Sequence, residues 1–291
     1  MKDGPDPPLG PAAGDPIPPA LARRLVRLDP FRRSLQAPAP ARPADQARSE
    51  IRLALIWGAL THGIFGLAAL SMLVGLGSGM RLGIGAVPQP WAWAANLLLL
   101  LQFPLGHSWF LSRRGRGRLG RLAPGGEAAG RTLATSTYAL IASLQLLALF
   151  WLWTPSGQVW RAPDGGALAL ALIPYAAAWA FLGKASWDAG AEVQSGLLGW
   201  FSLLRGIRPI FPPMPERGAF RFLRQPIYFA FALVTWTVPV WTPDALLTAT
   251  VLTLYCALGP LLKERRFDAM FGERWRTYRA RTPYWLPRAP R

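Results

Sequence analysis

Three residues at the start of an apolar segment have side chains suited to binding an anionic ligand. Arg224, Gln225 and Pro226 stand between a basic segment and a run that reads IYFAFALVTW. Proline at the first helical position sacrifices no hydrogen bond, so we expect a helix to begin at Pro226, with the Gln225 side chain capping its free amides. The amino end of a helix is partly positive and Arg224 adds a full charge, which suits a carboxylate.

A second charged cluster, LLKERRF, follows the next apolar segment and contains Glu264. If the two segments form antiparallel helices, Glu264 returns to the end of the hairpin at which Arg224 and Gln225 lie. A carboxylate and a guanidinium placed together there could hold a zwitterionic ligand. The alternative interpretation is that these residues are solvated ion pairs or determinants of membrane topology.

The composition predicts an integral membrane protein. Of the 291 residues, 52% are hydrophobic and only 16% are charged, and six apolar runs approach the length that crosses a bilayer. These runs cover residues 53–76, 91–111, 135–153, 167–187, 226–241 and 245–262. We expect an all-α polytopic fold of about six transmembrane helices, ending in a helical hairpin and an amphipathic cytoplasmic tail. The fifth run, at about 24 Å, is short for a hydrocarbon core of about 30 Å.

The net charge of +17 is distributed unevenly along the chain. Nearly all basic residues lie before the first run, in 112–134, in 188–225 and after the sixth run, whereas the connections 77–90 and 154–166 hold only Arg81 and Arg161. The positive-inside rule then predicts that both termini are cytoplasmic. Topology explains the charge without a nucleic-acid partner, and we expect none.

The apolar runs and the basic residues together divide the chain into three predicted regions. Residues 1–50 are rich in proline and arginine and lack a signal peptide's apolar core, so we expect a disordered cytoplasmic tail. Residues 51–187 would form the first four helices, and residues 188–291 a cofactor-binding loop, the helical hairpin and the C-terminal segment. The single cysteine, Cys256, lies in an apolar run, and we expect neither a disulfide nor a metal site.

The C-terminal part of the chain, 218–287, resembles the membrane methyltransferases related to isoprenylcysteine carboxyl methyltransferase. Their pattern is Arg-His-Pro-x-Tyr, a helical hairpin, a Glu-Glu pair, then Phe-Gly-Glu-x-Tyr-x-x-Tyr; here the corresponding text reads RQPIY, KE and FGERWRTY. Upstream, LQFPLGHSWFLSRR is similar to the methanethiol S-methyltransferase and NnrU branches of the same superfamily. The combined resemblance covers roughly residues 50 to 290.

This resemblance implies S-adenosylmethionine bound at the cytoplasmic side, and a small thiol or a lipophilic molecule as methyl acceptor. The residues that it places at the cofactor are Arg224, Gln225, Pro226, Tyr228, Glu264 and Tyr278. Phe271, Gly272, Glu273 and Pro283 match the rest of the C-terminal pattern. Arg224 would hold the cofactor's carboxylate and Glu264 its amino or hydroxyl groups, while the two tyrosines would wall the pocket.

Two positions depart from the pattern. Gln225 stands where the family has histidine, and Lys263 stands where it has the first glutamate. Glutamine forms hydrogen bonds but cannot titrate, so cofactor contact survives more readily than acid–base chemistry. Lys263 reverses a charge beside the expected sulfonium. A catalytically inactive relative that keeps the fold is therefore an alternative.

We place His107 and Arg265 in the catalytic group. His107 lies in the sequence GHS, near the cytoplasmic end of its apolar run, where it could bind or deprotonate the acceptor. The alternative is a neutral imidazole bonded to Ser108 or a backbone carbonyl. His62 is interpreted as structural, although His62 and His107 together could ligate haem, as in relatives on the NnrU side.

Overall fold

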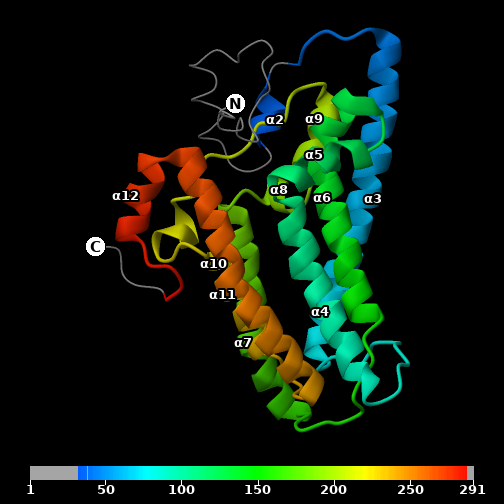
Figure 1. Ribbon diagram of the computed structural model, residues 1–291, viewed down its shortest axis with the longest axis vertical. Helices are drawn as coiled ribbons and strands as arrows, with labels where there is room; N and C mark the ends of the chain where they lie inside the picture. The colour runs from blue at the N-terminus through cyan, green and yellow to red at the C-terminus, as the bar shows by residue number, and fades with distance from the viewer. Residues whose placement is uncertain (1–31, 38, 287–291) are drawn as a thin grey trace.

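The computed structural model describes residues 32–37 and 39–286, and the described part is built almost wholly of helices (Figure 1). The long helices are α3 (Ala44–Gly77), α4 (Trp91–Phe110), α6 (Gly126–Trp151), α7 (Gly165–Asp188) and α11 (Pro243–Phe271). The short ones are α2 (Arg32–Gln36), α5 (Arg113–Leu122), α8 (Ala191–Gln194), α9 (Leu197–Arg205), η1 (Gly218–Arg221), α10 (Pro226–Trp236) and α12 (Glu273–Arg281).

Four helices, α3, α6, α7 and α11, are each long and apolar enough to cross a bilayer, and α4 with α5 could make a fifth span. The expected all-helical membrane fold is confirmed, but the number six is not. The difference lies in α10, which ends at Trp236 and reaches only about 16 Å. Pro239 follows closely, and a proline restrains the residue before it from helical geometry.

The first long helix begins earlier than expected. α3 starts at Ala44, so the predicted boundary of the N-terminal tail at residue 50 falls inside a helix. Gln46 donates a hydrogen bond to Glu50 one turn later, at 2.9 Å, and Arg42 forms an ion pair with the same carboxylate at 2.7 Å. Such pairs extend a helix beyond its apolar stretch. Residues 1–31 of the predicted tail lie outside the described residues.

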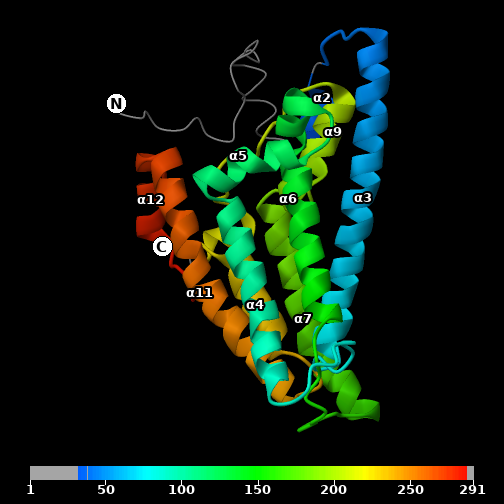
Figure 2. The ribbon, with the colours of Figure 1, turned by 45° about the vertical axis from the view of Figure 1, so that its right-hand side comes forward.

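α6 is the centre of one group of helices and packs against α3, α4, α5 and α9. The contact with α5 is close because Gly130 faces Gly120: a Cβ atom on Gly130 would lie 2.0 Å from the Gly120 carbonyl oxygen. Small residues allow this approach between membrane helices. α5 turns away from α4 by 94° and runs across the end of the bundle (Figure 2).

The hairpin of α10 and α11 packs against α7 and forms a second group. Pro243 occupies the first turn of α11 and the Thr242 hydroxyl accepts from the Ala245 amide at 2.9 Å, as in a regular helix N-terminus. The same hydroxyl donates to the Gly79 carbonyl at 2.7 Å, which ties the hairpin to the turn after α3. α11 is about 44 Å long, so its charged last turns extend past a hydrocarbon core of about 30 Å.

The start of α3 and the end of α11, with α12 beside it, lie at the same end of the bundle (Figure 1). The three connections 78–90, 152–164 and 237–242 lie at the opposite end (Figure 1). We call the first of these ends the site end and the second the far end. The start of α10 and the end of α11 are therefore neighbours at the site end, as the hairpin prediction required.

Candidate active site

Arg224, Gln225 and Glu264 meet at the site end, where α10 begins and α11 finishes. The Arg224 Nε atom lies 3.0 Å from Glu264 Oε1, and the two side chains are only 11% and 8% exposed. Gln225 is fully buried, and its Nε2 donates to the same Glu264 oxygen at 2.9 Å. The predicted convergence of the carboxylate with the guanidinium is thus present.

The expectation that Gln225 caps α10 is wrong. Its side chain makes no capping hydrogen bond; its amide instead bridges Glu264 and Lys263, whose Nζ donates to Gln225 Oε1 at 3.2 Å. Charged partners form stronger hydrogen bonds than a backbone amide, so the side chain turns toward them. Pro226, at the first position of α10, begins the helix as predicted.

Lys263 is inserted among aromatic rings. Its Nζ lies 5.2 Å from the ring centre of Phe267, 5.7 Å from that of Phe220 and 5.8 Å from that of Tyr228. Aromatic faces attract cations at such distances. Together the three rings form a cation-binding surface next to the Arg224–Glu264 pair, and Tyr228, predicted as a wall of the cofactor site, belongs to it.

The C-terminal segment closes over this cluster. The Tyr278 hydroxyl donates to the Phe220 carbonyl at 2.7 Å, and burial raises the pKa of Tyr278 above its ordinary value. Arg224 donates from Nη1 to the Arg279 carbonyl at 2.9 Å, and the Arg279 side chain reaches Glu264 at 3.9 Å. Tyr278 thus supports the site by holding the backbone of η1, rather than by lining the charged cluster with its hydroxyl.

Tyr284 adds a second aromatic contact to the cluster. The Arg224 guanidinium lies 5.5 Å from the Tyr284 ring centre, and the Tyr284 hydroxyl donates to the Ala257 carbonyl at 2.7 Å. Burial raises the pKa of Tyr284 to about 12, so its hydroxyl stays protonated near neutral pH. Neither Tyr284 nor Arg279 was predicted as a site residue, because only folding of the C-terminal segment brings them back to Arg224.

A depression of about 250 Å³ opens onto the Glu264 carboxylate. It is lined by Leu261, Glu264, Arg265, Asp268 and Arg279. Arg265, predicted to be catalytic, is exposed and belongs to this outer surface. The next residue, Arg266, is half-buried.

His107 lies in an aromatic environment on α4. Its ring centre is 4.9 Å from that of Tyr138 and 5.2 Å from that of Phe103. The His107 Nδ1 atom is buried and has no hydrogen-bond partner within the described residues. His62 lies on α3, with its ring 5.8 Å from that of Trp200. The two histidines thus contact different side chains.

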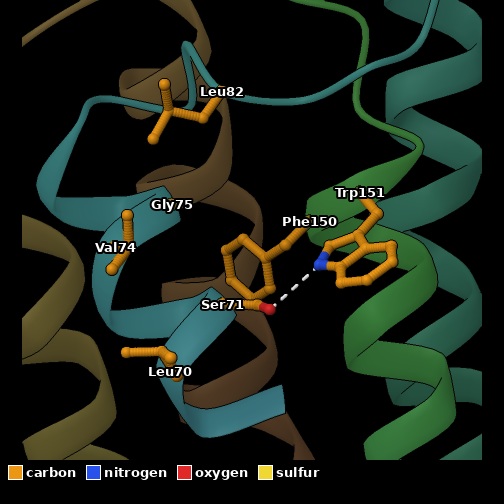
Figure 3. A pocket seen from close by; sticks show the side chains of 7 residues that line it. All are labelled: Leu70, Ser71, Val74, Gly75, Leu82, Phe150 and Trp151. Carbon is orange, nitrogen blue, oxygen red and sulfur yellow. Dashed lines mark hydrogen bonds between the residues drawn. The ribbon is translucent and has the colours of Figure 1, made fainter. Parts of the chain in front are cut away.

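Another depression lies between α3 and α6, toward the far end (Figure 3). It measures about 260 Å³ and is lined by Leu70, Ser71, Val74, Gly75, Leu82, Phe150 and Trp151. Its polar contact is a hydrogen bond of 3.0 Å from Trp151 Nε1 to Ser71 Oγ. It contains no ionisable side chain and none of the predicted site residues.

The fold and the site define a helical integral membrane protein with a buried, predominantly cationic cluster where two helix ends converge. The chain is 30% identical over 218 residues to the methanethiol S-methyltransferase of Mycobacterium tuberculosis, which covers 69% of this chain and 81% of the relative. It belongs to the methanethiol S-methyltransferase family.

Two further relatives carry the same name. Methanethiol S-methyltransferase 1 of Bradyrhizobium diazoefficiens is 31% identical over 194 residues, which make up 66% of each chain. The enzyme of Crocosphaera subtropica is 26% identical over 200 residues, 65% of this chain and 72% of the relative. No family model matches the chain, and no solved structure matches it.

Proposed function

We propose that the protein is an integral membrane methyltransferase that uses S-adenosylmethionine to methylate a small thiol. The observation that supports this most is the buried Arg224–Glu264 pair, which lies at the position where the family resemblance expects the cofactor. The names of the relatives, which specify methyl transfer to methanethiol, support the acceptor class. We further propose that the site faces the cytoplasm of a bacterial inner membrane, with both termini on that side.

The residues present suit S-adenosylmethionine in charge and chemistry. Arg224 can bind a carboxylate, and Glu264 can accept from an amino group or ribose hydroxyls. Phe220, Tyr228 and Phe267 already surround a cation, the Lys263 ammonium, and the same faces suit a sulfonium or an adenine ring. The depression beside Glu264 gives a route from the aqueous side to the carboxylate.

When bound, S-adenosylmethionine supplies a methyl group on a positively charged sulfur. The protein's own contribution is mainly positioning, which can lower a barrier by several kcal/mol. Arg224 and Glu264 fix the polar groups of the donor, Gln225 and Tyr278 hold those side chains and the backbone of η1 in place, and His107 faces the acceptor. Because His107 Nδ1 is buried without a partner in the described residues, it can form a hydrogen bond to the acceptor.

The test is methyl transfer by the purified protein. Reconstituted protein, methanethiol and S-adenosylmethionine are expected to give dimethyl sulfide, measured by gas chromatography. Arg224→Ala and Glu264→Ala should reduce the rate at least tenfold, while Arg131→Ala, an exposed arginine at the same end, should leave it unchanged. Absence of product from the wild-type protein, at a donor concentration that saturates binding, would favour the inactive relative instead.

A further inference from the structure

Three arginines follow one another along the exposed face of α5, the helix that runs across the site end. Arg114, Arg118 and Arg121 are spaced by four and three residues, so they share one face of the helix, and all three are exposed. Gly115 and Leu119, on a neighbouring face, are buried. Because that face packs against the bundle, the arginines project away from it. We call the three residues the arginine stripe.

The arginine stripe has no carboxylate partner within residues 32–37 and 39–286. None of the ion pairs formed there involves its members, and α5 itself contains no acidic residue. The nearest carboxylate along the chain is Glu127, and Arg131 already holds it at 2.7 Å. The positive charge of the stripe is therefore available to an anion from outside the chain.

An exposed apolar stripe on α4 leads up to these arginines. Its members recur every three or four residues on one face of the helix and are all exposed: Leu98, Leu101, Leu105 and Trp109. On a helix of a membrane bundle, such a face contacts lipid acyl chains. Tryptophan is typical of the membrane–water interface, so Trp109 marks the level at which the acyl chains end.

The two stripes meet at Trp109. The Arg118 guanidinium lies 5.2 Å from the Trp109 ring centre, a cation–π contact. The chain turns by 94° between the two helices (Figure 2). Ser112 caps α5 by accepting from the Gly115 amide at 3.2 Å, and a Cβ atom on Gly115 would lie 2.1 Å from the Trp109 carbonyl oxygen. The turn thus places positive charge immediately beyond the aromatic end of the apolar stripe.

We propose that this surface binds an acidic phospholipid of the leaflet at the site end, with the headgroup phosphate on the arginine stripe and an acyl chain along the leucines of α4. A phospholipid carries an anion and an apolar chain in the same order as the surface. Guanidinium groups bind phosphate oxygens in a bidentate manner. An acidic headgroup has a net negative charge, whereas a zwitterionic one also carries a cation that the arginines repel.

Membrane topology alone does not account for this arrangement. The positive-inside rule requires basic residues on one side of the membrane. It does not require them to share one face of a helix, to lack carboxylates, or to adjoin the end of a lipid-facing stripe. The proposal is also independent of the proposed function, because no residue of the Arg224–Glu264 cluster takes part in it.

The experiment titrates the full chain, solubilised in a neutral detergent, with phosphatidylglycerol or with phosphatidylcholine of the same acyl chains, and measures bound lipid by native mass spectrometry. Each arginine near an acidic surface contributes roughly fivefold to binding. We expect wild type to prefer phosphatidylglycerol by about tenfold or more. The triple variant Arg114→Gln, Arg118→Gln, Arg121→Gln should lose that preference, with phosphatidylcholine affinity changed less than about twofold.

The matched control removes three exposed arginines that do have carboxylate partners, and it should keep the preference: Arg48→Gln, Arg131→Gln and Arg274→Gln. Arg118→Lys, which keeps the charge, should retain most of the affinity for phosphatidylglycerol. Soluble glycerol 3-phosphate should not displace the lipid, because it has no acyl chain for α4.

Equal affinity of wild type for the two lipids, or wild-type affinity for phosphatidylglycerol in the triple variant, would overturn the proposal. Displacement of the lipid by glycerol 3-phosphate would also overturn it, since the surface would then bind a soluble phosphate. If thermal unfolding shows that the triple variant does not fold, the three single variants provide the same test, each with an expected loss of roughly fivefold.

Discussion

The two ends of α11 each bury a carboxylate, and the partners of the two differ. At the far end, Asp244 is 1% exposed and accepts from Trp153 Nε1 at 3.0 Å, from the Ser156 amide at 3.0 Å and from the Ser156 hydroxyl. These donors are all neutral. At the site end, Glu264 is surrounded by Arg224 and Arg279. Lys263 donates to Gln225, which in turn donates to Glu264.

The difference separates a structural carboxylate from one suited to binding. Asp244 is saturated by donors that bring the connection 152–164 against the start of α11, so its charge serves the fold. Glu264 lies among more positive groups than one carboxylate can neutralise, and the excess is available to an anionic part of a ligand. Replacing Asp244 should therefore change stability, whereas replacements around Glu264 should change ligand binding.

Asp244→Ala should have the largest effect, and the effect should be on stability. Two buried donors and one hydroxyl would lose their acceptor, and we expect a loss of about 3 kcal/mol in the free energy of unfolding. Thermal unfolding in detergent measures it, with Asp244→Asn as the control that keeps an acceptor. Weaker ligand binding by Asp244→Ala protein that is still folded would contradict a purely structural role for Asp244.

Arg224→Lys should act on binding. Lysine keeps the charge but loses the planar guanidinium that contacts Glu264, the Arg279 carbonyl and the Tyr284 ring. We expect affinity for S-adenosylhomocysteine to fall about tenfold, which corresponds to about 1.4 kcal/mol. Arg131→Lys is the matched exposed control, and equal affinities for Arg224→Lys and wild type would remove Arg224 from the site.

Tyr278→Phe removes a single hydrogen bond to the Phe220 carbonyl. We expect a loss of about 1 kcal/mol in stability and a smaller change in ligand affinity, because the hydroxyl holds η1 rather than a ligand. Thermal unfolding and calorimetry on the same preparation separate the two effects. A loss of affinity without a loss of stability would instead make Tyr278 a direct binding residue.

Lys263→Met should have the smallest effect, and its sign is informative. The ammonium occupies the faces of Phe220, Tyr228 and Phe267, so its removal should free them for a sulfonium. We expect the affinity for S-adenosylmethionine, relative to that for uncharged S-adenosylhomocysteine, to rise about threefold, in line with cation–π energies of about 0.5–1 kcal/mol. An unchanged ratio would mean that the sulfonium binds elsewhere.

The sequence allowed prediction of the hairpin and of the Arg224–Glu264 pair, because antiparallel helices must return a residue to the end at which they began. It did not allow prediction of the hydrogen-bond partners of the Gln225 side chain, which bonds to Glu264 and Lys263 instead of capping α10. Arg265 and Arg266 are adjacent and chemically identical, so only the rotation of α11 tells which of the two is exposed.

The most direct test of the central claim, that converging helix ends form the donor site, is calorimetry with S-adenosylhomocysteine on wild type, Glu264→Gln and Asp244→Asn in one detergent. Loss of a hydrogen bond to a charged group is expected to cost about 2 kcal/mol, so Glu264→Gln should bind roughly 30-fold more weakly, while Asp244→Asn should bind like wild type. Equal affinities for Glu264→Gln and wild type, or a loss confined to Asp244→Asn, would contradict the account.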